Sequence, residues 1–241
     1  MKMVCFGIDI SNNDISCSDS LINNVEADLS NIEDAGAEFA RLSNITGDDI
    51  VITAVTDDDC LEAVNKAIYD VLYDNAEGYD DLNGVGSSPS EAGEGISYAC
   101  IDLDRKFYPD AVILAFDTYC GEPFVDKVAN SAMKAAVGMD SVGDVACSSV
   151  KKVREIPGVG YVSSQTDDPV VVASVNNVED VGVVAGAMIG AVLGSKNTYL
   201  VKRHTPANVI PGSVICSVTA IMNSNIIDLA KPLAYKMRIL E

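Results

Sequence analysis

The stretch DDIVITAVTDD, residues 48–58, is an extended run of β-branched and apolar residues with aspartates at both ends. A second stretch, DDPVVVASVNN at residues 167–177, aligns with it without a gap and shares both leading aspartates, one valine and one alanine. Such runs predict β-strands. The acidic or amide residues that close each run suit helix N-caps, so we expect helices over residues 60–75 and 178–194.

A longer pair of segments repeats in the same order. Residues 97–134 align without a gap with residues 199–236, and their apolar positions match throughout. We therefore predict an α/β (α+β) fold with an internal duplication, in which two similar small-sheet domains are each covered by helices. The first repeat is expected over residues 1–138 and the second over residues 139–241. The first also carries a Gly/Ser/Asp-rich insertion at about residues 77–95.

Composition limits the classes of function. The chain has 36 acidic and 16 basic residues and a formal net charge of −20, which argues against a nucleic-acid partner. Apolar residues make up 48% of the chain, enough for a sizeable core. The most apolar stretch, residues 181–194, is shorter than a membrane span and reads as a buried helix. We expect a cytoplasmic protein that has no membrane partner.

The seven cysteines are odd in number and show no metal-ligand spacing. P-loop, GxSxG and HExxH signatures are absent, so the sequence predicts no cofactor and no metal, and identifies no catalytic residue. A nucleophilic cysteine stays open, with Cys5, Cys120 and Cys147 nearest to loops or strand ends and His204 as the only histidine. Asp57 to Asp59 and Asn176–Asn177 suit helix caps, with a cation site as the alternative.

Several stretches resemble the tandem-domain shell proteins of bacterial microcompartments, in the permuted ethanolamine-utilisation form. MKMVCFGIDI at the N-terminus is similar to the displaced strand of that family, and NNVEADLS to the short acidic helix behind it. ITGDDIVITAV and SSPSEAGE resemble its strand–Asp-Asp–strand passage and its Ser/Pro/Gly loop. The resemblance implies a homotrimeric structural protein that tiles into sheets, with a central pore for small polar or anionic metabolites.

The resemblance also implies where the pore lies. Basic residues gather at KRH, residues 202–204, ahead of a loop bracketed by Pro206 and Pro211, and again at residues 105–106 in the matching segment. Three copies of these loops would raise the electrostatic potential around the axis of a trimer. The predicted pore or ligand-binding residues are Arg105, Lys106, Tyr108, Lys202, Arg203, His204 and Asn208.

Two other functions remain open from the residues alone. The chain can be a duplicated α/β enzyme or ligand-binding protein that takes a small anionic metabolite between its halves, with or without a cysteine nucleophile. In that case the cluster of Lys202, Arg203 and His204 would hold a phosphate or a carboxylate. A non-catalytic regulatory domain is the third alternative.

Overall fold

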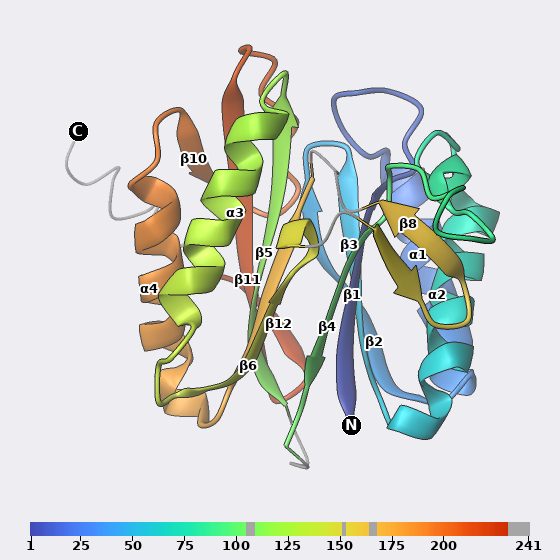
Figure 1. The fold of residues 1–241 in the computed structure, drawn as a ribbon, viewed down its shortest axis with the longest axis horizontal. Coiled ribbons are helices and arrows are strands. Elements are labelled where there is room, and N and C mark those ends of the chain that lie inside the picture. Colours follow the sequence, from blue (N-terminus) through green and yellow to red (C-terminus); the bar gives the residue numbers. More distant parts are fainter. Residues whose placement is uncertain (105–108, 151–152, 164–167, 231–241) are drawn as a thin grey trace.

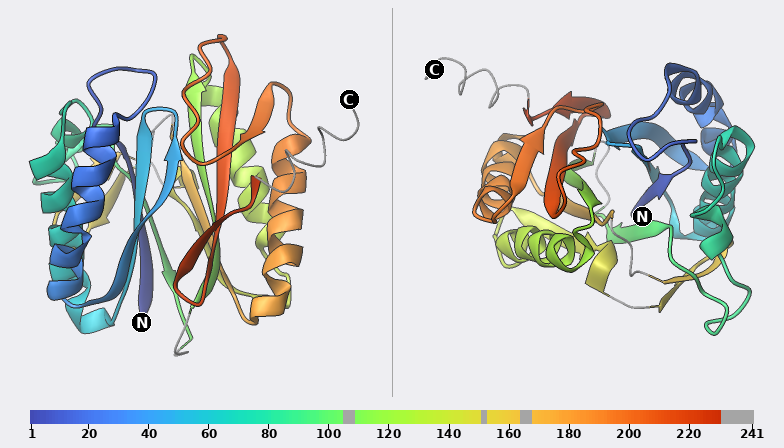
Figure 2. Two further views of the ribbon diagram at one scale, coloured as in Figure 1. Left: turned by 180° about the vertical axis from the view of Figure 1, so that it is seen from behind. Right: turned by 90° about the horizontal axis from the view of Figure 1, so that it is seen from above.

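The computed structural model describes residues 1–104, 109–150, 153–163 and 168–230. Its helices and strands form four layers: a helix pair, two face-to-face sheets and a second helix pair (Figure 1). The view from above in Figure 2 shows the two helix pairs on opposite sides with both sheets between them. The mixed α+β class that the sequence predicts is therefore confirmed.

The first sheet has the strand order β2-β3-β1-β4 and is antiparallel throughout. Its strands are β1 (Lys2–Asp9), β2 (Ala37–Thr46), β3 (Asp49–Thr56) and β4 (Ser97–Asp102), and its outer face is covered by α1 (Asp19–Asp34) and α2 (Leu61–Asn75). Every residue of β3 is buried, because this strand is covered on both faces. That explains why its sequence reads as a continuous apolar run rather than an alternating one.

The second sheet has the order β10-β11-β5-β9-β6, and β12 pairs with residues 219–222 at the C-terminal end of β11. Its strands are β5 (Asp110–Tyr119), β6 (Val142–Cys147), β9 (Val170–Val175), β10 (Thr198–Val201), β11 (Ser213–Met222) and β12 (Asn225–Asp228), and its outer helices are α3 (Glu122–Ala136) and α4 (Val181–Leu193). A separate hairpin of β7 (Val153–Ile156) and β8 (Gly160–Ser163) packs on the first helix layer through Ile156 and Val162.

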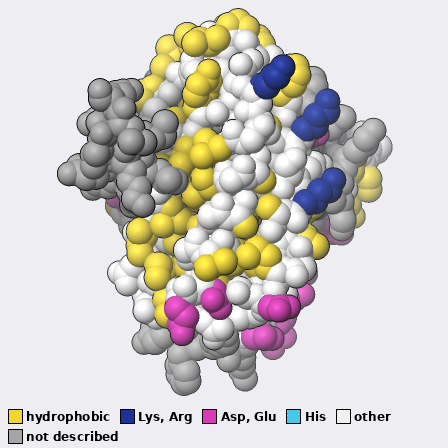
Figure 3. All heavy atoms as spheres, turned by 90° about the vertical axis from the view of Figure 1, so that its left-hand side faces the viewer, with side chains coloured by type: hydrophobic (Ala, Val, Ile, Leu, Met, Phe, Trp, Pro, Cys, Tyr) yellow, Lys and Arg dark blue, Asp and Glu magenta, His cyan; other side chains and the backbone are white. Residues whose placement is uncertain are grey.

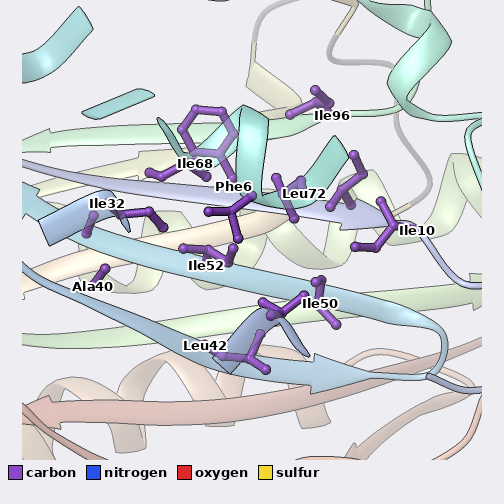
Figure 4. Packing of buried hydrophobic residues seen from close by; sticks show 14 of the residues in the cluster. Phe6, Ile10, Ile32, Ala40, Leu42, Ile50, Ile52, Ile68, Leu72 and Ile96 are labelled. Atoms are coloured by element: carbon purple, nitrogen blue, oxygen red, sulfur yellow. The ribbon is translucent and has the colours of Figure 1, made fainter. Parts of the chain in front are cut away.

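Three apolar cores hold the layers together. One lies between the first sheet and its helices, where Phe6, Ile52, Ile68 and Leu72 pack (Figure 4). The second lies between the second sheet and its helices, and the third between the two sheets. The Gly/Ser/Asp-rich segment expected as an insertion contributes to the first core, because Leu82 within it is only 3% exposed.

Most predicted elements are present. The repeated runs form β3 and β9, and the helices expected after them are α2 and α4. The long matching segments give a different result: β5 and β11 pair antiparallel within one sheet, whereas β4 belongs to the other sheet. The chain thus passes from the first sheet to the second between Asp102 and Asp110. The structure does not clearly show an internal duplication, and the repeat boundary at residues 138/139 stays a prediction.

None of the helices in the described ranges is both long and apolar enough to cross a membrane. All seven cysteines are free thiols.

Candidate metal centre

The turn between β2 and β3 brings two aspartates to the end of the first sheet. It runs Gly47-Asp48-Asp49, and Gly47 has a φ of +65°, a backbone conformation that favours glycine. The Gly47 amide donates to the carbonyl of Thr205 at 2.8 Å. A Cβ at Gly47 would lie 1.7 Å from Oδ2 of Asp117, so only glycine lets the carboxylate of Asp117 approach.

Asp117 comes from β5 in the opposite sheet, which ends beside the same turn (Figure 1). One carboxylate oxygen from each of Asp48, Asp49 and Asp117 lies within 4.8 Å of the others. We call these three residues the carboxylate site. They line a cavity of about 290 Å³ between the sheets, together with Asp9, Asp14, Asp81, Thr118, Tyr119, Cys120, Asp168 and Ala207.

Asp49 is the least solvated member of the site. Its side chain is 4% exposed, and its Oδ1 has no hydrogen-bond partner among the described residues. Burial, followed by the nearby negative charges of Asp168, Asp117, Asp48 and Asp9, raises the pKa of the Asp49 carboxyl well above its ordinary value. A buried acceptor without a partner is costly, and so is carboxylate repulsion in a poorly solvated cavity.

A bound cation would relieve both costs. Carboxylate oxygens are the ligands that Mg²⁺, Mn²⁺ and Ca²⁺ prefer in proteins. Asp48, Asp49 and Asp117 would each supply one carboxylate oxygen. Because the ligands come from two sheets, such a cation would join the two halves of the fold. The donor set fits a hard divalent ion.

Comparisons with known proteins identify the family. The chain matches, over residues 2–237, the family described as uncharacterised conserved protein UCP005278. It belongs to this family. An uncharacterised protein of Methanothermobacter thermautotrophicus is 58% identical over 240 residues, covering 100% of this chain and 98% of that one. Uncharacterised protein MJ1676 of Methanocaldococcus jannaschii is 40% identical over 227 residues, covering 94% of each.

The comparison with solved structures includes a microcompartment protein. A microcompartment protein from Desulfitobacterium hafniense aligns with 80% of this chain and 88% of its own, at 9% sequence identity and a TM-score of 0.26. A score this low does not establish a common fold. The UCP005278 family is therefore the relationship that the comparisons support.

The cysteine thiols of this UCP005278 member differ in how far they are exposed to solvent. Burial raises the pKa of Cys5 to about 12 and also raises the pKa of Cys147, so neither forms a thiolate readily. Burial and the charges of Asp9, Asp48 and Glu77 raise the pKa of Cys17 to about 12, and its Sγ donates to the Asp48 carbonyl at 3.0 Å. Cys120 differs from them: it is exposed, has a φ of +52° and lines the same cavity as the carboxylate site.

The basic loop of the sequence analysis links the two sheets. The guanidinium of Arg203 donates to the carbonyls of Leu42 at 2.8 Å and Ser43 at 3.2 Å, and it lies 3.6 Å from a carboxylate oxygen of Glu26. His204, with a φ of +65°, donates its amide to the carbonyl of Ile45 at 2.7 Å. We call residues 202–207 the strap, because they attach the second half of the chain to β2.

The other predicted pore residues lie in different surroundings. Lys202 and His204 have exposed side chains. Asn208 is partly buried, and its Oδ1 accepts from the Ile210 amide at 3.3 Å. Arg105, Lys106 and Tyr108 fall outside the described residues. The role of all these residues in a pore remains a prediction.

Sequence patterns did not indicate the carboxylate site, because its members are far apart in the chain and carry no ligand spacing. Asp48 and Asp49 read as the start of a strand. Asp117 gave the one usable signal: it is the only charged residue in VILAFDTYC, residues 112–120, an otherwise apolar strand. A charged residue inside a buried strand is rarely found without a partner or a function.

Proposed function

We propose that this protein binds a divalent cation at the carboxylate site and acts there on a small anionic metabolite. Two observations on Asp49 carry the proposal: its buried Oδ1 has no hydrogen-bond partner among the described residues, and one of its carboxylate oxygens lies within 4.8 Å of a carboxylate oxygen of Asp48 and of Asp117. This refines the enzyme or ligand-binding alternative, since the cavity lies between the two sheets.

The cation explains how so acidic a cavity can take an anion. Without a cation, the aspartates that line it repel a phosphate or a carboxylate. A bound divalent ion would supply the positive charge and open coordination positions for the oxygens of the metabolite. Cys120, exposed on the cavity wall, is the thiol placed to contact such a ligand.

Binding of Mn²⁺, followed by calorimetry and by the loss of the free-ion electron paramagnetic resonance signal, tests the cation site. We expect one ion per chain. Asp49→Asn and Asp117→Asn should each weaken binding at least 10-fold, because each removes one of three anionic ligands. Asp74→Asn is the matched control, since Asp74 is an exposed aspartate on α2. Equal affinity in all four proteins, or no binding at millimolar Mn²⁺, would refute the cation site.

Assembly into a shell layer is a second proposed function, taken from the resemblance to microcompartment shell proteins. The exposed apolar residues Val183 and Leu193 on α4 provide an apolar face for self-association, which the shell function would use in a trimer rather than in a dimer. The shell function predicts a trimer of the 25.4 kDa chain and hexagonal sheets. Light scattering and negative-stain microscopy test it, and a species smaller than a trimer at high protein concentration counts against it.

A further inference from the structure

Helix α4 has no polar side chain. Its sequence, VGVVAGAMIGAVL, consists of glycine and apolar residues only. The inner face packs into the second core through Val181, Val184, Ala185, Met188, Ile189 and Val192. This accounts for one side of the helix. A surface helix of a globular protein normally carries polar residues on the other side.

The outer face of α4 is exposed and equally apolar. Val183 is 59% exposed and Leu193 is 49% exposed; the exposed Gly186 and Gly190 lie between them along the helix, and the exposed Gly182 directly precedes Val183. In Figure 3 apolar side chains occupy the centre of this side of the molecule, with basic groups along one edge and acidic groups at the lower end. A chain with a net charge of −20 therefore leaves one helix face without charge.

The glycines are not required by packing within the described chain. A Cβ at Gly182, Gly186 or Gly190 would meet no heavy atom within 4 Å. Glycine inside a helix lowers helix stability relative to alanine, so three at a spacing of four residues carry a cost. They give a shallow groove along the helix, and small residues at this spacing let a second helix approach closely.

We propose that a second copy of this chain covers the face, with the two α4 helices packed antiparallel about a twofold axis. Charge fixes the direction. Glu179 and Asp180 directly precede α4, and Lys196 follows it. An antiparallel pair brings the acidic end of each helix to the basic end of the other, whereas a parallel pair would place acidic ends together.

A single twofold axis accounts for the glycine, apolar and charged positions along the helix. An axis at the level of Met188 sets Gly186 opposite the partner's Gly190 and Val183 opposite the partner's Leu193. The same axis sets Asp180 opposite the partner's Lys196. A twofold contact of this kind uses one surface patch twice and closes at a dimer. A membrane surface suits the face less well, since anionic lipid would repel so acidic a protein.

Sedimentation equilibrium of the full chain tests the contact. We expect a dimer. Val183→Lys should raise the dissociation constant at least 10-fold, and so should Gly186→Leu. The leucine variant is the sharper test, because leucine adds apolar surface and raises helix propensity. If the face associated only through non-specific apolar contact, Gly186→Leu would strengthen the association, whereas close helix packing requires that it weaken it. Ile15→Lys is the control, since Ile15 is 51% exposed in the loop between β1 and α1.

Charge exchange tests the orientation of the helices. Asp180→Lys and Lys196→Asp should each weaken the dimer, and the double variant should recover it, with circular dichroism confirming that each variant is folded. A monomer at all concentrations, a dimer unaffected by both face variants, a trimer in place of a dimer, or a monomer that cosediments with phosphatidylcholine vesicles through α4 would each overturn the proposal. The dimer does not depend on the carboxylate site, so either can fail without the other.

Discussion

At the scale of single residues, Asp49 carries most of the chemistry of the site. It is buried, it faces other carboxylates, and its Oδ1 has no partner among the described residues. Gly47 supports the same conclusion, since its positive φ and its contact with Asp117 let the two sheets bring carboxylates together. These features cost stability, and ligand binding is the ordinary compensation for such a cost.

The raised pKa of Asp49 predicts a pH dependence of stability. A carboxyl whose folded pKa lies above its unfolded value of 3.8 favours folding fully below pH 3.8, and this contribution is lost as pH rises through the folded pKa. Asp49→Asn cannot ionise. In metal-free buffer it should therefore be more stable than the native protein at pH 7, by about 1–3 kcal/mol.

Urea denaturation at pH 4 and pH 7, with a chelator present, measures the difference. The advantage of the Asn variant should shrink toward pH 4, where the native side chain is also increasingly protonated. Asp74→Asn, which changes an exposed carboxyl by the same chemistry, should show no such trend. An Asn variant that is less stable than the native protein at pH 7 would contradict the assignment of Asp49 as an uncompensated charge.

Only part of this residue-level picture was predictable. The acidic composition made the carboxylate site hard to predict, because short acidic runs are expected by chance in a chain with 36 acidic residues. Asp117, alone in an apolar strand, pointed to a function, but no sequence rule pairs it with the turn at Gly47. The pairing depends on the packing of β5 against the β2–β3 turn, a contact between separate sheets.

At the scale of elements, the strap explains the basic cluster at residues 202–204. Arg203 holds two backbone carbonyls of β2 and has a side chain that is 26% exposed. Replacement by lysine removes the planar fork that reaches both carbonyls. We expect Arg203→Lys and Arg203→Ala to lower the free energy of unfolding by about 1.5–3 kcal/mol, because hydrogen bonds to charged donors are lost.

Urea denaturation of both variants measures this loss. Lys202→Ala is the control: its side chain is exposed, and we expect a change within about 0.5 kcal/mol. If Arg203 serves only in a pore, its replacement should leave stability unchanged, and equal stability of all the variants would support that alternative.

The junction of β5 and α3 places Cys120 apart from the other thiols. Cysteine reactivity follows exposure and thiolate content. Cys5, Cys17, Cys147 and Cys216 are buried, and Cys60 and Cys100 are partly exposed. Iodoacetamide should label Cys120 first in the native protein, and Cys120→Ser should remove the fast phase. Mass spectrometry of peptides identifies the site; early labelling of Cys60 or Cys100 instead would contradict the exposure of Cys120.

Element prediction succeeded where the chain is locally consistent. β1, β3, α2 and α4 were each visible as a periodic or continuous apolar run between polar ends. β6, β7 and β12 were not predicted, because they are short and partly exposed and their burial depends on distant neighbours. Short strands take their conformation from pairing more than from intrinsic propensity.

At the scale of the whole molecule, the two sheets are held by polar as well as apolar contacts. Asn44 is fully buried, donates to Oγ of Ser217 at 2.9 Å and accepts from Oγ1 of Thr219 at 2.9 Å. These bonds fix β2 against β11. Together with the apolar core between the sheets they make the layers one structural unit. The duplication inferred from the sequence did not predict that the two sheets form one unit, because it assigns β5 and β11 to separate domains.

The position of the carboxylate site makes the cation a link between the layers. Asp48 and Asp49 belong to the first sheet and Asp117 to the second, so a bound ion stabilises only the assembled sandwich. Mn²⁺ at 100 times its dissociation constant should add about 2.7 kcal/mol to the free energy of unfolding. Thermal denaturation should show one transition that moves to higher temperature. Asp117→Asn should show a clearly smaller shift, because a site that binds at least 10-fold more weakly is stabilised less at the same Mn²⁺ concentration, whereas Asp74→Asn should show the full shift. If Mn²⁺ shifts the native protein and the Asp117 variant equally, the ion binds elsewhere, and the two sheets are joined only by their packing and by the Asn44 hydrogen bonds.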